Sequence, residues 1–177
     1  RGYNSKGVQF NFDYDTELGG VAHNITGGAR MHSDSIRRFQ QQDTIDLSGD
    51  APVVVEGALG SGGNRSQVAD ALSLWIEDDI DLGKLTLSPG VRYEKVEGDW
   101  IDFASDDTNT KTNGATGEID EVVPGVGMTY ELSETTNAFG GVYKGISTPS
   151  PRGFLKSGTG IEESTGYELG IRTQKDG

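Results

Sequence analysis

Apolar and polar side chains alternate with a period of two along much of this chain. The pattern is clearest in four stretches: 8–14, 84–93, 122–131 and 167–174. Because successive side chains of a strand point to opposite faces of a sheet, the pattern predicts strands with one apolar and one polar face. Three further stretches alternate less cleanly and are interpreted as strands as well: 21–34, 67–80 and 137–147.

These stretches predict an all-β fold with seven antiparallel strands. The predicted strands are 3–15, 21–36, 67–81, 84–101, 118–131, 137–147 and 162–174. Several exceed the usual strand length of roughly 5–6 residues in soluble proteins. They reach the ~9–11 residues that a tilted strand needs to cross a bilayer.

The connections between the predicted strands alternate strictly between short and long. The short ones are 16–20, 82–83 and 132–136, and the long ones are 37–66, 102–117 and 148–161. Outer-membrane barrels have short periplasmic turns and longer outer loops, with an apolar outward face and a polar inward face. The chain is therefore predicted to be a segment of an antiparallel transmembrane β-barrel. Tyr14 and Tyr130 fall beside short turns, where an interfacial aromatic girdle would lie.

Composition excludes several other classes of protein. The net charge of -13 disfavours nucleic acid as a partner, because phosphate neutralisation needs clustered Lys and Arg. No apolar run approaches the ~20 residues of a membrane helix, and the absence of cysteine removes disulfides and thiolate metal sites. The run Gly57–Gly63 lacks the Lys-Ser/Thr pair of a phosphate loop and is interpreted as a flexible loop. No catalytic residue set and no cofactor motif is found.

Several motifs occur in order along the chain. The first is HNITGGARMHSD at 23–34, followed by Ile36 and Arg38-Phe39. The others are LTLSPGVRYE at 85–94, VPGVGMTY at 123–130, GVYKGISTPSP at 141–151, Glu162-Glu163-Ser164 and YELGIR at 167–172. Taken together, these motifs resemble the barrel domain of TonB-dependent receptors, and the nearest type is the ferric citrate or siderophore receptor.

The resemblance implies a 22-stranded barrel in the outer membrane of a Gram-negative bacterium, closed by a plug domain. It implies iron transport rather than enzymatic activity, with no cofactor and with a ferric chelate as the substrate. The implied partners are membrane lipid, lipopolysaccharide and the TonB-ExbB-ExbD complex, which would act through a plug and a TonB box. We expect residues 1–177 to be part of the barrel domain only, with the plug and the remaining strands outside them, since the chain starts at Arg1 and seven is an odd number of strands.

Four basic residues are candidates for binding an anionic chelate, because Arg in particular presents a rigid donor fork to carboxylates. Arg37 and Arg38 stand where a strand would enter the longest loop, and adjacent residues point to opposite faces, so at least one should face inward. Arg152 and Lys156 lie in the loop 148–161, where solubilising charge is the alternative interpretation.

The histidines and the acidic loops carry weaker signals. His23 and His32 are nine residues apart with no carboxylate at a ligand spacing, so ordinary hydrogen bonding is expected and no metal site is predicted. The acidic stretch between 102 and 121 lacks the spacing of a calcium loop and is interpreted as a solvated loop.

Two other functional classes remain as alternatives. A soluble β-sandwich, acting as an adhesin or a carbohydrate-binding module, would bury its apolar face against a second sheet. An outer-membrane hydrolase would need Ser, His and acidic residues near the outer rim, where only His32 lies. Within the transport hypothesis, the acidity of the loops also leaves a neutral or cationic substrate open, such as a vitamin or carbohydrate complex.

Overall fold

The computed structural model describes residues 1–107, 109–153 and 160–174. Their elements are β1 (Gly2–Leu18), β2 (Val21–Gln40), β3 (Thr44–Asp46), β4 (Val53–Val55), β5 (Gly63–Asp81), β6 (Leu85–Phe103), β7 (Lys111–Ser133), β8 (Thr136–Ser147) and β9 (Glu162–Thr173). Within these described residues, no helix is long and apolar enough to cross a membrane.

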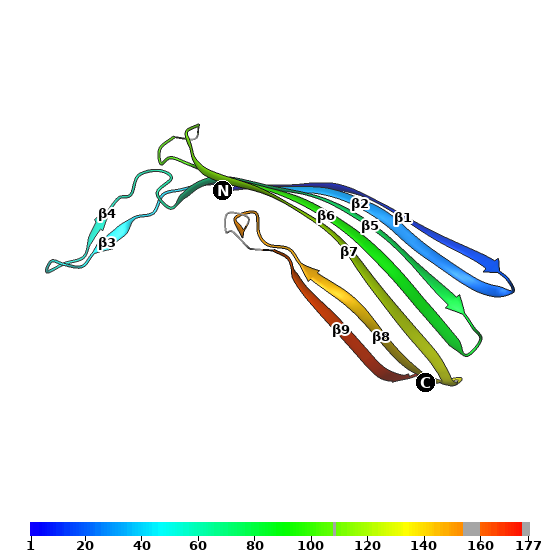
Figure 1. Cartoon of the computed structure of the whole chain (residues 1–177). Helices are drawn as coiled ribbons and strands as arrows, with labels where there is room; N and C mark the ends of the chain where they lie inside the picture. The colour runs from blue at the N-terminus through cyan, green and yellow to red at the C-terminus, as the bar shows by residue number, and fades with distance from the viewer. Residues whose placement is uncertain (108, 154–159, 175–177) are drawn as a thin grey trace.

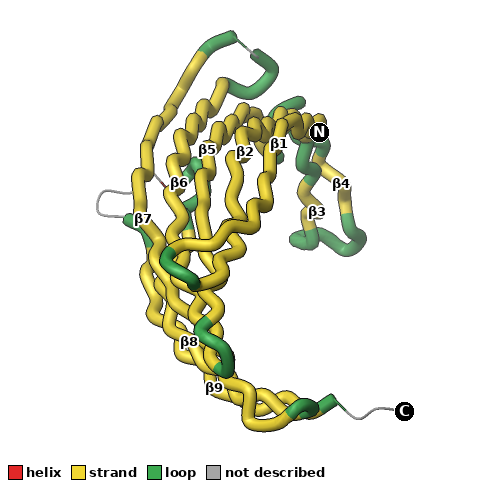
Figure 2. The backbone as a smooth tube through the Cα atoms, turned by 90° about the vertical axis from the view of Figure 1, so that its right-hand side faces the viewer, coloured by secondary structure: helices red, strands yellow, loops and turns green. Residues whose placement is uncertain are grey.

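Seven long strands form one antiparallel sheet in the order β1-β2-β5-β6-β7-β8-β9. Figure 1 shows them as long neighbouring ribbons, and Figure 2, turned by 90°, shows that the sheet is bent into an arc. The edge strands β1 and β9 each pair with one neighbour only. The predicted all-β, antiparallel architecture with seven strands is confirmed.

The short and long connections collect at opposite ends of the sheet. At one end the strands are joined by turns of two or three residues, and in the first of them Gly19 and Gly20 adopt φ values of 63° and 85°, which glycine accepts without steric cost. At the other end, the connection after β2 carries the small hairpin β3–β4, which projects away from the sheet in Figure 1. The sequence analysis missed this hairpin because strands of three residues leave no periodic signal.

The strands extend further at the long-loop end than their hydrophobic pattern predicts. Strand β5 begins at Gly63 rather than 67, and β7 begins at Lys111 rather than 118. In these extensions polar side chains occupy both faces, so alternation is lost while the backbone ladder continues. The ladder Arg65↔Asp102 and Asp102↔Asn113 runs through this region.

One face of the sheet carries an apolar band of limited height. On β6 the band contains Leu85, Leu87, Pro89, Val91 and Tyr93, and the same face then becomes charged. Eight residue steps at ~3.4 Å, tilted by roughly 40°, span about 21 Å, close to the ~25 Å apolar band of outer-membrane barrels. The charged continuation is Lys95, Glu97 and Asp99 on β6, with Asp120 and Glu118 opposite on β7.

The apolar face is uncovered. Leu74, Val126 and Met128 in the middle of the sheet are 42%, 44% and 48% exposed. Among the described residues, the only buried hydrophobic ones are Trp100 and Ile119. A soluble sandwich, the alternative architecture, would bury this face against a second layer, and the described residues form no such layer.

The opposite face is polar and more crowded, as expected on the concave side of a curved sheet. By register it contains Gln9, Arg30, Ser73, Glu94 and Glu121. Ser73 is only 3% exposed although it is small and polar. We refer to this face as the concave face and to the apolar one as the convex face.

Candidate functional site

Two arginines lie side by side on the concave face at the long-loop end. Arg38 of β2 is the direct register partner of Arg65 of β5, and Arg65 is in turn opposite Asp102 of β6. Like charges directly opposite each other destabilise a sheet. The arrangement therefore has an electrostatic cost that a bound anion would relieve.

A tryptophan brings a third arginine to the same place. Trp100 of β6 is 2% exposed, and the Cζ atom of Arg65 lies 4.8 Å from its ring centroid. The Cζ atom of Arg152, which follows β8, lies 5.2 Å from the same ring. Trp100 thus joins two cations from distant parts of the chain, Arg65 and Arg152, through cation–π contacts.

Two of these arginines have an N–H donor that no described residue uses. Among the described residues, none of Arg38, Arg65 and Arg152 forms an ion pair within 4.0 Å. The Nε atoms of Arg38 and Arg65 and the Nε1 atom of Trp100 are buried and have no hydrogen-bond partner within the described part of the chain. Buried donors are normally satisfied, so unpaired ones at one place indicate a missing acceptor. We call Arg38, Arg65, Trp100 and Arg152 the arginine site.

Arg37 lies on the other face and its guanidinium is occupied. Its Nη1 atom donates to the carbonyl oxygens of Arg38 (2.7 Å) and Arg65 (2.9 Å), and its Nη2 atom donates to Oδ1 of Asn64 (2.6 Å). It also lies over the rings of Phe39 and Phe103. Arg37 consequently holds the strand ends in place behind the arginine site.

Asn64 holds the connection between β6 and β7 against the start of β5 at this end of the sheet. Its side chain is 5% exposed, and its Nδ2 atom donates to the carbonyl oxygens of Ala104 (2.5 Å) and Asp107 (2.7 Å). The backbone N–H of Asp106 donates to the carbonyl oxygen of Leu59 (2.9 Å), which links the same two segments. The loops that border the arginine site are thus anchored by one buried amide.

The structure brings only some of the predicted site residues together. Arg38 is the register partner of Arg65, and Arg152 shares the Trp100 ring with Arg65. Arg37 lies on the opposite face, and Lys156 lies outside the described residues. Sequence reasoning missed Arg65 and Trp100. Arg38 and Arg65 both fall in the predicted connection 37–66, so the two predicted strands end before these residues can pair.

The histidines have local partners. Nδ1 of His23 lies 2.8 Å from Oδ2 of Asp78 on the convex face, near the short turns. Nε2 of His32 lies 3.7 Å from Oδ2 of Asp34 on the concave face. In the described ranges, no group of three or more His, Asp or Glu side chains is placed to hold a metal ion.

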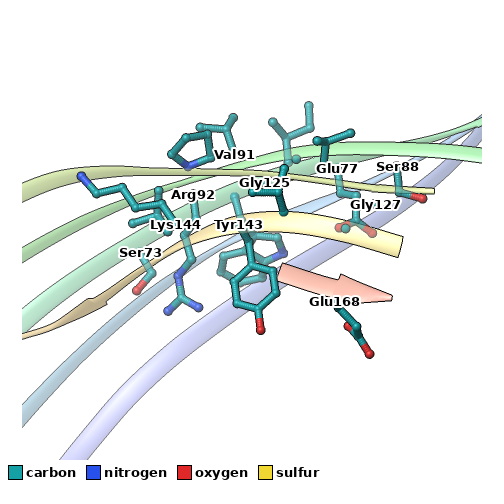
Figure 3. Close-up of a pocket in the computed structure, with 18 of the residues that line it drawn as sticks. Ser73, Glu77, Ser88, Val91, Arg92, Gly125, Gly127, Tyr143, Lys144 and Glu168 are labelled. Carbon is teal, nitrogen blue, oxygen red and sulfur yellow. The ribbon is translucent and has the colours of Figure 1, made fainter. Parts of the chain in front are cut away.

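Half-way along the sheet the concave face forms a hollow of about 580 Å³. Figure 3 shows Ser73, Arg92, Tyr143 and Glu168 projecting to the same side of it. Arg92 forms an ion pair with Glu94, whose Oε2 atom accepts a hydrogen bond from Ser73 Oγ at 2.5 Å. The charges in this part of the wall are therefore locally compensated, in contrast to those of the arginine site.

Comparison with known proteins identifies related sequences and folds. A family model described as "TonB dependent receptor-like, beta-barrel" matches residues 1–177. The ferric citrate transporter FecA in its unliganded form superposes with a TM-score of 0.76 at 19% identity, over 97% of this chain and 25% of that one. The siderophore receptor PiuA from Acinetobacter baumannii gives 0.72 at 14% identity, over 96% and 29%.

A third receptor shows the same architecture. BauA, the ferric preacinetobactin receptor from Acinetobacter baumannii, gives a TM-score of 0.60 at 17% identity, over 97% of this chain and 26% of that one. At these identities the superpositions establish the fold alone. The chain spans between 25% and 29% of the length of these three receptors.

Proposed function

Since the chain belongs to the TonB-dependent receptor β-barrel family, we propose that it forms part of the wall of an outer-membrane transporter for an anionic ferric chelate, with the arginine site as a contact for that anion. Members of this family are receptors and transporters of the Gram-negative outer membrane, not enzymes. In this proposal residues 1–177 are a section of the barrel domain. The convex face contacts lipid and lipopolysaccharide, and energy comes from the TonB-ExbB-ExbD complex through a plug.

The observation that carries the proposal is the register pair Arg38 and Arg65, whose guanidinium groups form no ion pair within the described residues. Their register partnership places two guanidinium groups next to each other on the concave face, and Arg152 approaches from the loop after β8. Guanidinium groups bind carboxylates in a bidentate manner, and a charged hydrogen bond contributes roughly 1.5–3 kcal/mol. A chelate that exposes carboxylates would satisfy the unpaired donors together with Trp100 Nε1.

The three solved receptors described above are named for ferric citrate, for siderophores and for ferric preacinetobactin. This supports a ferric chelate as the substrate class. A neutral or cationic substrate is the competing proposal, and it rests on the acidic loops, since the hairpin connection between β2 and β5 carries Asp43, Asp46, Asp50 and Glu56 without any Lys or Arg. The two proposals differ in which probe the receptor binds.

The test uses the full-length receptor and three probes: ferric citrate, a neutral ferric hydroxamate and vitamin B12. Arg65→Ala and Arg38→Ala should each weaken the binding of ferric citrate by about 10- to 100-fold while leaving the folded amount unchanged. Arg172→Ala is the matched control, because Arg172 faces the same side at the short-turn end and stacks on Phe139.

Equal affinity of the wild type and both site variants for ferric citrate would refute the anion contact. Binding of only the neutral chelate or only the vitamin by the wild type would favour the competing proposal.

A further inference from the structure

Four glycines form a bare patch on the concave face, in the hollow that Figure 3 shows. Gly90 of β6 is paired with Gly125 of β7, and Gly127 of β7 is paired with Gly141 of β8. The patch spans three neighbouring strands, roughly 10 Å across, and the step from Gly125 to Gly127 along β7, roughly 7 Å, from ordinary strand dimensions. We call these four residues the glycine floor.

The sheet itself does not require glycine at two of these positions. A Cβ atom at Gly127 would be 3.7 Å from its nearest neighbour, Cβ of Ser88, and one at Gly90 would be 3.4 Å from the flexible carboxylate of Glu77. Neither glycine has a positive φ. By contrast, a Cβ at Gly27 would be 2.7 Å from the carbonyl oxygen of Trp75, so packing between strands explains that glycine.

Glycine weakens a strand, and in a strand interior it often marks a site where a ligand or another backbone approaches closely. Gly125 and Gly141 are tighter, with a Cβ at 3.2 Å from Tyr143 Cβ and from Val126 O respectively, and are partly explained by the sheet. Gly90 and Gly127 are not explained by contacts within the sheet. The feature that favours glycine at these two positions must therefore lie on the open, concave side of the wall.

The side chains around the floor provide the contacts of a binding surface. The hollow is lined by Trp75 and Tyr143, whose rings offer apolar faces, by the basic Arg30 and Arg92, and by the acidic Glu77 and Glu168. Its volume of about 580 Å³ falls within the usual range of small-molecule sites. In Figure 3, Arg92 and Tyr143 project beside the floor on the same side as Glu168.

Charge on the neighbouring wall restricts where an anion can pass. Between the hollow and the short turns, the concave face of β1 and β5 carries carboxylates and no basic side chain: Asp13, Asp15, Glu17, Glu77, Asp79 and Asp81. The adjacent part of β6 and β7 carries Thr86, Ser88, Thr129 and the glycines, with one carboxylate, Glu131, at its short-turn end. An anion is therefore repelled more strongly by the first wall than by the second.

From this arrangement we infer that the glycine floor is a second, deeper contact surface for the imported anionic chelate, on its route from the arginine site toward the short-turn end. This inference rests on the proposed transport function. The floor lets the chelate lie directly against the backbone of β6–β8, while Arg30, Arg92, Trp75 and Tyr143 border it.

The test separates binding at the outer site from passage along the wall. Gly127→Trp in the full-length receptor should leave the affinity of de-energised cells for ferric citrate within twofold of wild type and lower the initial uptake rate at least tenfold. Met128→Trp is the matched control, because the neighbouring residue faces lipid and should not change uptake. The neutral ferric hydroxamate replaces ferric citrate as the probe if the wild type imports only that chelate.

Uptake by Gly127→Trp within twofold of wild type overturns the inference. Increased entry of a large antibiotic such as vancomycin also overturns it, because the glycines would then seat another part of the protein that seals the lumen.

A second variant covers the case in which the tryptophan prevents folding. Gly127→Cys, modified after folding with a methyl adduct or with a bulky maleimide, should transport normally with the first and poorly with the second. Equal effects of both adducts overturn the inference. The outcome is independent of Arg65→Ala, so a failure of the glycine floor and a failure of the arginine site can be told apart.

Discussion

Replacing Asn64 with alanine should loosen two of the three connections at the long-loop end of the sheet, the one between β2 and β5 and the one between β6 and β7. The side chain makes three hydrogen bonds, one of them with a charged donor: from Arg37 (2.6 Å), to Ala104 O (2.5 Å) and to Asp107 O (2.7 Å). A neutral hydrogen bond contributes about 1 kcal/mol and a charged one about 1.5–3 kcal/mol. The sum is about 4 kcal/mol, and water reaching the exposed carbonyl oxygens should reduce it to about 3 kcal/mol.

A local loss of about 3 kcal/mol corresponds to roughly 100-fold less protection from hydrogen exchange. The informative amides are those of Asp106, which donates to Leu59 O, and Ala104, which donates to Thr110 O, both at 2.9 Å. Amides of β6 within the apolar band should keep their protection, because their ladder bonds do not depend on Asn64.

Asn113→Ala is the matched control for this experiment, because that side chain bonds only the adjacent N–H of Gly114. Asn64→Asp keeps the acceptor for Arg37 and loses the two donations, so its effect should fall between those of wild type and Asn64→Ala. Unchanged exchange at Asp106 and Ala104 in Asn64→Ala would refute the idea that one buried amide anchors both loops.

Two further substitutions test the wall itself. Gly27→Ala places a Cβ 2.7 Å from the carbonyl oxygen of Trp75 and should destabilise the folded receptor by about 1–3 kcal/mol. Gly127→Ala should cost less than about 1 kcal/mol, because a Cβ there meets only ordinary contacts. Urea titration of the refolded receptor measures both losses, and equal losses would contradict the packing argument. Val126→Arg, in the middle of the apolar band, should make the free energy of folding into lipid bilayers less favourable by about 2–4 kcal/mol. Asp120→Arg, beyond the band, should change it by only about 0–1 kcal/mol. A reversed order would mean that the convex face does not contact the hydrocarbon.

The strand pattern, the two faces and the alternation of turns and loops were determined by the sequence alone. Inside the apolar band, one face is apolar and the other is polar, so the period of two is preserved, as in Val8 to Tyr14 and Leu85 to Tyr93. Outside the band both faces are polar, and the pattern disappears although the backbone ladder continues. For this reason the starts of β5 and β7 were placed too late by four and seven residues.

The arginine site was decided by the tertiary structure. Sequence reasoning singled out Arg38 and Arg152 as separate candidates, but no local pattern links residues 38, 65, 100 and 152. Their meeting depends on the register that pairs Arg38 with Arg65 and on the path of the segment after β8, which brings Arg152 to the ring of Trp100. Register and loop path are set by contacts between distant segments, and such contacts leave no mark in the neighbouring sequence.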